Sequence, residues 1–193
     1  MEDLKKEILA LLGQSDYTPL DLAGLQKHFH QENSIALMKI LVALEEEQQI
    51  MRSSSNKYHL PSHLSVFKGQ VAMHKKGFAF VKLLENDEEV YVSQNHTNGA
   101  YHDDIVMVKI ISESSGDNSE GEIVKIVERG MKRAVGLFCR QGKKLYVSSD
   151  DAKYPKRIDI DENHTLGAMP GHKVVVDITD YQPKVKGVVT KII

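Results

Sequence analysis

The sequence of 193 residues contains no tryptophan and only one cysteine, Cys139. A single cysteine cannot build an internal disulfide framework, so a disulfide-stapled secreted domain is excluded and a reducing compartment is favoured. No apolar run approaches the ~18 residues of a membrane-spanning helix, and the acidic start of the chain does not resemble a signal peptide. We therefore expect a cytoplasmic protein with no membrane partner.

The sequence also has few of the patterns that mark catalytic or metal sites. It contains no glycine-rich phosphate loop. His59 and His63 have the spacing of zinc ligands on a helix, but Pro61 between them argues against a helix. Asp103-Asp104 and Asp150-Asp151 are expected to form turns, because neither pair has partner aspartates. We expect no catalytic residue, metal or cofactor within this chain.

The charge distribution offers one candidate binding surface. The net charge is −2, which does not by itself suggest a nucleic-acid-binding protein. Residues 121–193, however, contain 14 Lys and Arg against 9 Asp and Glu. Between residues 129 and 149 the chain has six basic residues and no acidic one: Arg129, Lys132, Arg133, Arg140, Lys143 and Lys144. This stretch predicts a surface that contacts phosphates, although a solvated basic face is the commoner role of a charge run.

The first 60 residues have the pattern of helices followed by a hairpin. An apolar stripe predicts a helix over residues 3–12, and Thr18-Pro19 predicts the start of a second helix, with Thr18 as its N-cap. Asn33-Ser34 predicts the start of a third helix, whose expected apolar face is Ile35, Met38, Leu41, Val42 and Leu44. Two short extended segments around residues 53–56 predict a β-hairpin.

Three helices and a hairpin in this order indicate a winged helix-turn-helix domain over residues 1–60. The third helix would end at Glu45-Glu46-Glu47, whereas a helix that reads DNA is usually basic. We therefore expect this domain to contact a protein, the ribosome or structured RNA, or to serve as a cap.

The most informative motif lies between residues 75 and 93. It consists of Lys76-Gly77-Phe78-Ala79-Phe80-Val81 and Val90-Tyr91-Val92-Ser93. Since alternate residues of a strand share a face, Phe78 and Phe80 are expected to point away from the side that holds Ala79 and Val81. Paired with the strand of Tyr91, they would form a platform on which unpaired bases stack, with Lys75 and Lys76 contacting phosphates beside it. The alternative is that both phenylalanines line a barrel interior.

An internal repeat defines the architecture of the rest of the chain. Three blocks of sequence, which begin at residues 69, 102 and 121, recur 66 to 68 residues later. Short strands with turn signals between them indicate β-barrels. The chain is therefore expected to hold two similar barrels in tandem.

These patterns predict an α+β protein of several domains. The winged helix-turn-helix would be followed by a linker over residues 61–66 and by two OB-type five-stranded barrels, over residues 67–127 and 128–193. A polar segment at residues 112–120 is expected to form a loop inside the first barrel.

Together these features resemble a known family. The motifs around Phe78 and Tyr91 are similar to the two ribonucleoprotein motifs of cold-shock domains, which are OB-type barrels. A winged helix, two tandem cold-shock barrels and a final Gly-x-Val-x-Lys-Ile resemble the N-terminal half of ribonuclease R, a family of bacterial 3′-to-5′ exoribonucleases that degrade structured RNA. The resemblance implies that the chain binds RNA, preferably single-stranded or 3′-tailed structured RNA. We expect it to be a monomer.

The sequence departs from the family pattern at two informative positions. Cold-shock proteins usually have histidine where Ser93 stands. The serine in this chain therefore lacks one stacking ring. The family's Gly-Asp pair at the last turn of the first barrel reads Asp103-Asp104, so this turn is expected to need a strained backbone. The family's hydrolysis depends on Mg²⁺ held by several aspartates, and the resemblance places them in a catalytic domain after the second barrel.

Three functions are weighed from these residues. The leading one is the RNA-binding part of a ribonuclease R-like enzyme, in which Phe78, Phe80 and Tyr91 stack bases and the stretch from Arg129 to Lys144 guides the strand. A stand-alone RNA chaperone of cold-shock type would bind the same RNA without a catalytic partner. A winged-helix regulator with barrel-shaped ligand domains would prefer duplex DNA, and the acidic third helix counts against it.

Overall fold

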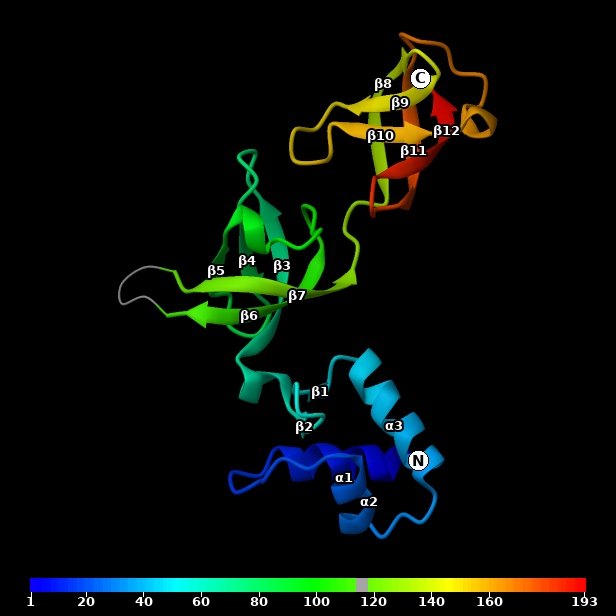
Figure 1. The fold of residues 1–193 in the computed structure, drawn as a ribbon. Helices are drawn as coiled ribbons and strands as arrows, with labels where there is room; N and C mark the ends of the chain where they lie inside the picture. Colours follow the sequence, from blue (N-terminus) through cyan, green and yellow to red (C-terminus); the bar gives the residue numbers. More distant parts are fainter. Residues whose placement is uncertain (114–117) are drawn as a thin grey trace. The chain divides into compact units, whose positions relative to one another are not determined.

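The computed structural model describes residues 1–113 and 118–193 (Figure 1). The chain divides into two compact units, Met1–Val66 and Phe67–Ile193. The loop expected at residues 112–120 falls partly on residues 114–117, which lie outside the described residues. In the described part of the chain, no helix is long and apolar enough to cross a membrane.

Three helices and a two-stranded antiparallel sheet form the first unit. The elements are α1 (Glu2–Leu12), α2 (Leu22–His28), α3 (Ser34–Glu46), β1 (Met51–Arg52) and β2 (Tyr58–His59). Buried aliphatic side chains from all three helices form its core, among them Ile8, Leu12, Leu25, Leu37 and Leu41. The predicted start of α3 is confirmed, because the side chain of Asn33 accepts hydrogen bonds from the backbone N–H groups of Ile35 and Ala36. The predicted hairpin is confirmed as well.

The second helix begins later than the sequence predicted. Its N-cap is Asp21, whose carboxylate accepts a hydrogen bond of 2.8 Å from the N–H of Gly24. The carbonyl of Leu20 accepts a hydrogen bond from the N–H of Tyr58, which ties the segment after Thr18-Pro19 to the hairpin. The prediction of a helix start at Thr18-Pro19 was therefore wrong.

The apolar face predicted for α3 was correct only in part. Leu41 and Leu44 are buried together with Leu37 and Ile40, which the prediction left out. The other three predicted members, Ile35, Met38 and Val42, are 65%, 47% and 45% exposed. A helix that is apolar on most of its circumference does not reveal from periodicity alone which face is buried.

Two closed five-stranded barrels make up the second unit (Figure 1). The first contains β3 (Val66–Met73), β4 (Ala79–Leu83), β5 (Glu89–Val92), β6 (Ile105–Ser112) and β7 (Glu120–Glu128), closed in the order β3-β4-β5-β7-β6. The second contains β8 (Arg133–Gln141), β9 (Lys144–Ser149), β10 (Arg157–Ile160), β11 (Lys173–Asp180) and β12 (Lys186–Ile192), closed in the order β10-β12-β11-β8-β9. Read around each barrel, the two orders are the same, and the prediction of two OB-type barrels is confirmed. Short 3₁₀ helices accompany the strands: η1 (Pro61–Leu64), η2 (Gln94–His96) and η3 (Glu162–His164).

A buried carboxylate links the first barrel to the segment that follows it. Asp104 is fully buried and accepts hydrogen bonds from the N–H groups of Tyr101 and Gly130, at 2.8 and 2.9 Å. Nη1 of Arg129 donates to the same carboxylate at 2.8 Å. The guanidinium also lies 4.5 Å from the ring centroid of Tyr181, which follows β11. We call the pair of Asp104 and Arg129 the clasp.

The turn that contains Asp104 has the strained backbone that the sequence predicted. Asp103 has a φ of +65°, a left-handed conformation that glycine adopts more easily. The second barrel has a glycine at the corresponding place, Gly171, with a φ of +98°. Backbone hydrogen bonds establish this correspondence. The N–H of Asp103 donates to the carbonyl of Val71, and the N–H of Gly171 donates to the carbonyl of Phe138, at the same place in the second barrel.

Candidate nucleic-acid interface

Three aromatic side chains of the first barrel gather on its outer face. Ala79 and Val81 are fully buried, whereas Phe78 and Phe80 are half-exposed and lie outside the barrel core. Phe80 of β4 is directly opposite Tyr91 of β5 in the register of the sheet. The three ring centroids are 5.6 to 6.0 Å apart. We call Phe78, Phe80 and Tyr91 the aromatic triad.

The turn between β3 and β4 adds a fourth ring and two cations. His74 is stacked on Phe78 with centroids 4.3 Å apart and an angle of 9° between the rings. Its Nδ1 accepts a hydrogen bond from the N–H of Lys76, and Gly77 closes the turn with a φ of +96°. Lys75 and Lys76 are exposed beside the aromatic triad. His74 was not predicted from the sequence, although its position four residues before Phe78 across a glycine turn could have indicated it.

The basic stretch divides into two halves with different surroundings. Arg129 belongs to the clasp, and Lys132 forms an ion pair of 3.2 Å with Glu128. Arg133 donates two hydrogen bonds to Asp177, at 2.6 and 3.2 Å. These bonds lower the pKa of the Asp177 carboxyl and raise the pKa of the Arg133 guanidinium. The first three basic residues therefore have acidic partners that the sequence did not reveal.

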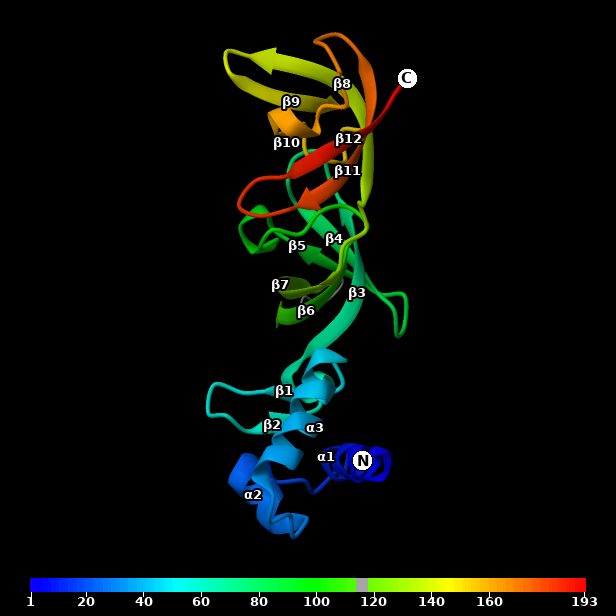
Figure 2. The ribbon, with the colours of Figure 1, turned by 90° about the vertical axis from the view of Figure 1, so that its right-hand side faces the viewer.

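The second half of the stretch lies on the hairpin of β8 and β9, which run together to a turn at residues 141–144 (Figure 2). Arg140, Lys143 and Lys144 are exposed. Within the described residues, none of the three forms an ion pair, and neither do Lys75 and Lys76 at the aromatic triad. Cations without an acidic partner are available to contact phosphates.

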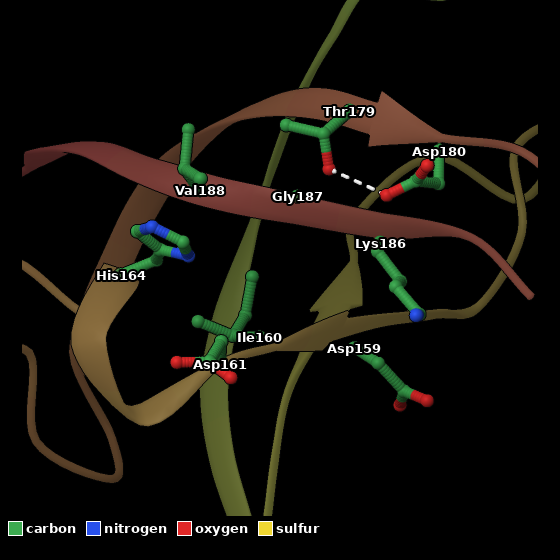
Figure 3. A pocket seen from close by; sticks show the side chains of 9 residues that line it. All are labelled: Asp159, Ile160, Asp161, His164, Thr179, Asp180, Lys186, Gly187 and Val188. Atoms are coloured by element: carbon green, nitrogen blue, oxygen red, sulfur yellow. Dashed lines mark hydrogen bonds between the residues drawn. The ribbon is translucent and has the colours of Figure 1, made fainter.

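A pocket on the second barrel has the opposite charge (Figure 3). It is lined by β10, the start of η3, β12 and the end of β11, with residues that include Asp159, Asp161, Asp180 and Lys186. A hydrogen bond from the backbone N–H of Asn163 is the main cause that lowers the pKa of Asp161, so this carboxyl stays charged at neutral pH. Three carboxylates around one lysine disfavour phosphate, and we do not count this pocket as part of the interface.

The described residues also offer no donor set for a metal ion. No group of three or more His, Cys, Asp or Glu side chains among them is arranged to hold one.

Two family profiles match the second unit. Residues 69–126 match the ribonuclease B OB domain, and residues 146–193 match the cold-shock domain.

Curated relatives cover almost the whole chain. The chain is 30% identical to ribonuclease R of Thermotoga maritima over 98% of its own length and 27% of the relative's. It is 28% identical to ribonuclease R of Vibrio parahaemolyticus and 25% identical to that of Escherichia coli, over 92% and 90% of its own length. In both of these the match spans 21% of the relative. The chain thus spans between 21% and 27% of the length of these three relatives.

Solved structures with the same fold are also found. One is RNase R of Mycoplasma genitalium in complex with ribose-methylated single-stranded RNA, with a TM-score of 0.57 and 18% identity over 65% of this chain and 21% of that one. Another is yeast Ssd1, a pseudonuclease, with a TM-score of 0.55 and 14% identity over 68% of this chain and 23% of that one. At these identities the likeness concerns the fold.

The profiles and the relatives agree with the arrangement of the two barrels. Both profile matches fall on the barrels, in the order OB domain and then cold-shock domain. These 193 residues therefore belong to the ribonuclease R family and correspond to its N-terminal region.

Proposed function

We propose that this chain is the RNA-binding N-terminal part of a ribonuclease R-like 3′-to-5′ exoribonuclease and that it binds single-stranded RNA. The observation that carries the proposal is the aromatic triad of Phe78, Phe80 and Tyr91, half-exposed on the outer face of the first barrel. Every unpaired base has a π-face, and each base stacked on an aromatic ring contributes roughly 1–3 kcal/mol. The triad thus offers a surface on which unpaired bases can stack. A duplex would present only its backbone and base edges to this surface.

Cations on both barrels support the same function. Lys75 and Lys76 lie beside the aromatic triad, and Arg140, Lys143 and Lys144 lie on the hairpin of the second barrel. Such cations attract the phosphates of a single strand whatever its sequence. In the proposed enzyme these cations guide RNA, including the 3′ tail of a structured RNA, toward the Mg²⁺-dependent catalytic domain of the family. Binding of the single strand also helps to open base pairs.

The other expected basic residues take a different place in the proposal. Arg129, Lys132 and Arg133 already hold acidic partners, so phosphate binding at these three residues would have to compete with ion pairs. We therefore assign them a smaller share of RNA binding than the hairpin.

For the first unit we propose a winged helix-turn-helix that contacts a protein or the ribosome. Its three helices and antiparallel hairpin support this assignment, and the exposed Ile35, Met38 and Val42 of α3 suit a protein surface better than a phosphate backbone. We further propose that the protein works as a monomer in the cytoplasm.

The proposal is tested by fluorescence anisotropy with labelled single-stranded RNA, blunt duplex RNA and duplex DNA at two salt concentrations. The chain should prefer single-stranded RNA, with a shallow dependence on salt. The double variant Phe78→Ala and Phe80→Ala should weaken this binding about 10-fold or more, because it removes two stacking surfaces. Leu84→Ala is the matched control, because Leu84 is an apolar side chain of the same barrel that is 54% exposed and lies outside the triad.

Three results would contradict the proposal. Unchanged affinity in the double variant would mean that the triad does not stack bases. Equal and steeply salt-dependent binding to all three nucleic acids would leave only the basic residues as the binding surface. Tight binding to duplex DNA alone would favour a winged-helix regulator instead.

A further inference from the structure

The second barrel has a tyrosine where the first barrel has the centre of its aromatic triad. Across the first three strands of each barrel, one row of buried side chains, Val71, Val81 and Val90, corresponds to Phe138, Val147 and Ile158. The adjacent outward row reads Ala72, Phe80 and Tyr91 in the first barrel and Cys139, Tyr146 and Asp159 in the second. Tyr146 therefore occupies the place of Phe80.

An arginine lies over this tyrosine and is fixed there. The guanidinium carbon of Arg157 is 4.3 Å from the ring centroid of Tyr146. Nε of Arg157 donates to the carboxylate of Asp159 at 2.7 Å, and Nη1 donates to the side chain of Gln141 at 3.4 Å. Its side chain remains 39% exposed, so the guanidinium covers the ring without being covered itself.

A guanidinium held over a ring in this way is a surface on which a base can stack. It is planar and delocalised, and RNA-binding proteins use guanidinium planes as well as aromatic rings to stack unpaired bases. The hydrogen bonds to Asp159 and Gln141 hold it in place before RNA arrives, which lowers the entropic cost of binding. Because Asp159 balances its charge, Arg157 would act through its flat face more than through attraction to phosphate.

We propose that Tyr146 and Arg157 form a second base-stacking site, where one nucleobase of a single-stranded RNA stacks on the guanidinium of Arg157. Lys144 occupies the outward position two residues before Tyr146, as Phe78 does before Phe80, and together with Lys143 it contacts the adjoining phosphate. The proposal rests on the proposed function, since it names a second place where the same single strand is bound.

The test uses the full chain and a labelled oligouridine of about 12 nucleotides, a length within the range that OB folds bind. Arg157→Lys keeps the positive charge and removes the flat face. It should weaken binding about 5-fold or more, with an unchanged slope of affinity against salt. Arg52→Lys is the matched control, because Arg52 is also paired with a carboxylate, that of Glu45, but lies outside the proposed interface and is not stacked on a ring in any contact of the described residues. This control should bind like the unmodified chain.

The outcomes separate this proposal from the proposed function. If the unmodified chain binds oligouridine and Arg157→Lys binds equally well, the second site is overturned while the aromatic triad stands. If Arg157→Lys and Arg52→Lys weaken binding alike, the loss is not specific to the arginine over Tyr146 and the second site is again overturned. If the unmodified chain binds no oligouridine, both proposals fail.

A second measurement, by NMR, follows RNA binding to the unmodified chain. The Nε–H signal of Arg157 in ¹⁵N NMR spectra, assigned from its loss in Arg157→Lys, should shift when oligouridine is added to the unmodified chain, because a stacked base adds its ring current. An Arg157 signal that stays in place at saturating oligouridine would overturn the proposal even if the variant folded poorly.

Discussion

The two barrels of the second unit share a strand order but present different outer surfaces. On the inner row, three valines of the first barrel correspond to Phe138, Val147 and Ile158 of the second, and all are buried. On the outer row, Phe80 and Tyr91 of the first barrel correspond to Tyr146 and Asp159 of the second, and Arg157 lies over Tyr146. The interior must be filled by apolar side chains, whereas the outer row is free to change its binding chemistry.

The largest expected effect concerns phenylalanine, which lies in the core of the second barrel and on the outer face of the first. Phe138 is 1% exposed in the core of the second barrel, so Phe138→Ala should lower the free energy of unfolding by about 3–5 kcal/mol. Phe80 is half-exposed on the first barrel, and Phe80→Ala should cost less than about half as much. Urea unfolding monitored by circular dichroism measures both. Equal losses would place Phe80 in the core and remove it from the aromatic triad.

The next effect concerns the clasp, which the second barrel lacks at the corresponding position. Asp104→Asn should destabilise the second unit by about 2–3 kcal/mol, because a buried charge-assisted hydrogen bond to Arg129 loses its anion. His172 takes the place of Asp104 in the second barrel and is exposed. His172→Ala is the control and should change the unfolding free energy by less than about 1 kcal/mol. A harmless Asp104→Asn would show that the clasp does not contribute to stability.

A smaller effect contrasts the two left-handed residues at the corresponding turns. Gly171→Ala should cost about 1–2 kcal/mol, because no side chain adopts a φ of +98° without strain. In Asp103→Gly the relief of strain is offset by the greater freedom of glycine in the unfolded chain, so the net change should stay below about 1 kcal/mol. Thermal unfolding of the two variants measures the difference, and a neutral Gly171→Ala would contradict the argument.

The smallest effect is on the titration of the exposed pair Arg133–Asp177. Hydrogen bonds from Arg133 lower the folded-state pKa of the Asp177 carboxyl below that of the unfolded chain. The pair therefore contributes stability above the unfolded pKa, and this contribution is lost as the pH falls through the folded pKa. A carboxyl NMR titration should show a midpoint below that of an ordinary aspartate, which Arg133→Gln moves back upward. A midpoint that does not respond to Arg133→Gln would contradict this cause.

Patterns that repeat along the chain allowed much of the fold to be predicted. The offset of 66 to 68 residues revealed two barrels, and the alternation of Phe78 and Phe80 with buried neighbours placed both rings on one face. The N-cap at Asn33 was predictable because its signal is local. Such features depend on neighbours in sequence, which a single chain displays directly.

Features that depend on distant neighbours were not predictable. The segment before α2 is tied to the hairpin by a hydrogen bond between Leu20 and Tyr58, and the partner of Arg129 lies 25 residues away. The stacking of Arg157 on Tyr146 likewise requires the register of β9 and β10. The sequence shows where an arginine stands in the chain, but not which acidic side chain or aromatic ring it contacts in the fold.

The clasp makes the first barrel dependent on residues that are synthesised after its last strand. Asp104 is buried before β6, but its cation and one of its N–H donors come from Arg129 and Gly130, beyond the end of β7 at Glu128. A protein truncated at residue 127 would hold a buried carboxylate without these partners. During translation, Asp104 can gain these two partners only after residue 130 has left the ribosome, and Tyr181, which packs on the arginine, arrives about 50 residues later. The completion of one barrel is thereby tied to the synthesis of the next.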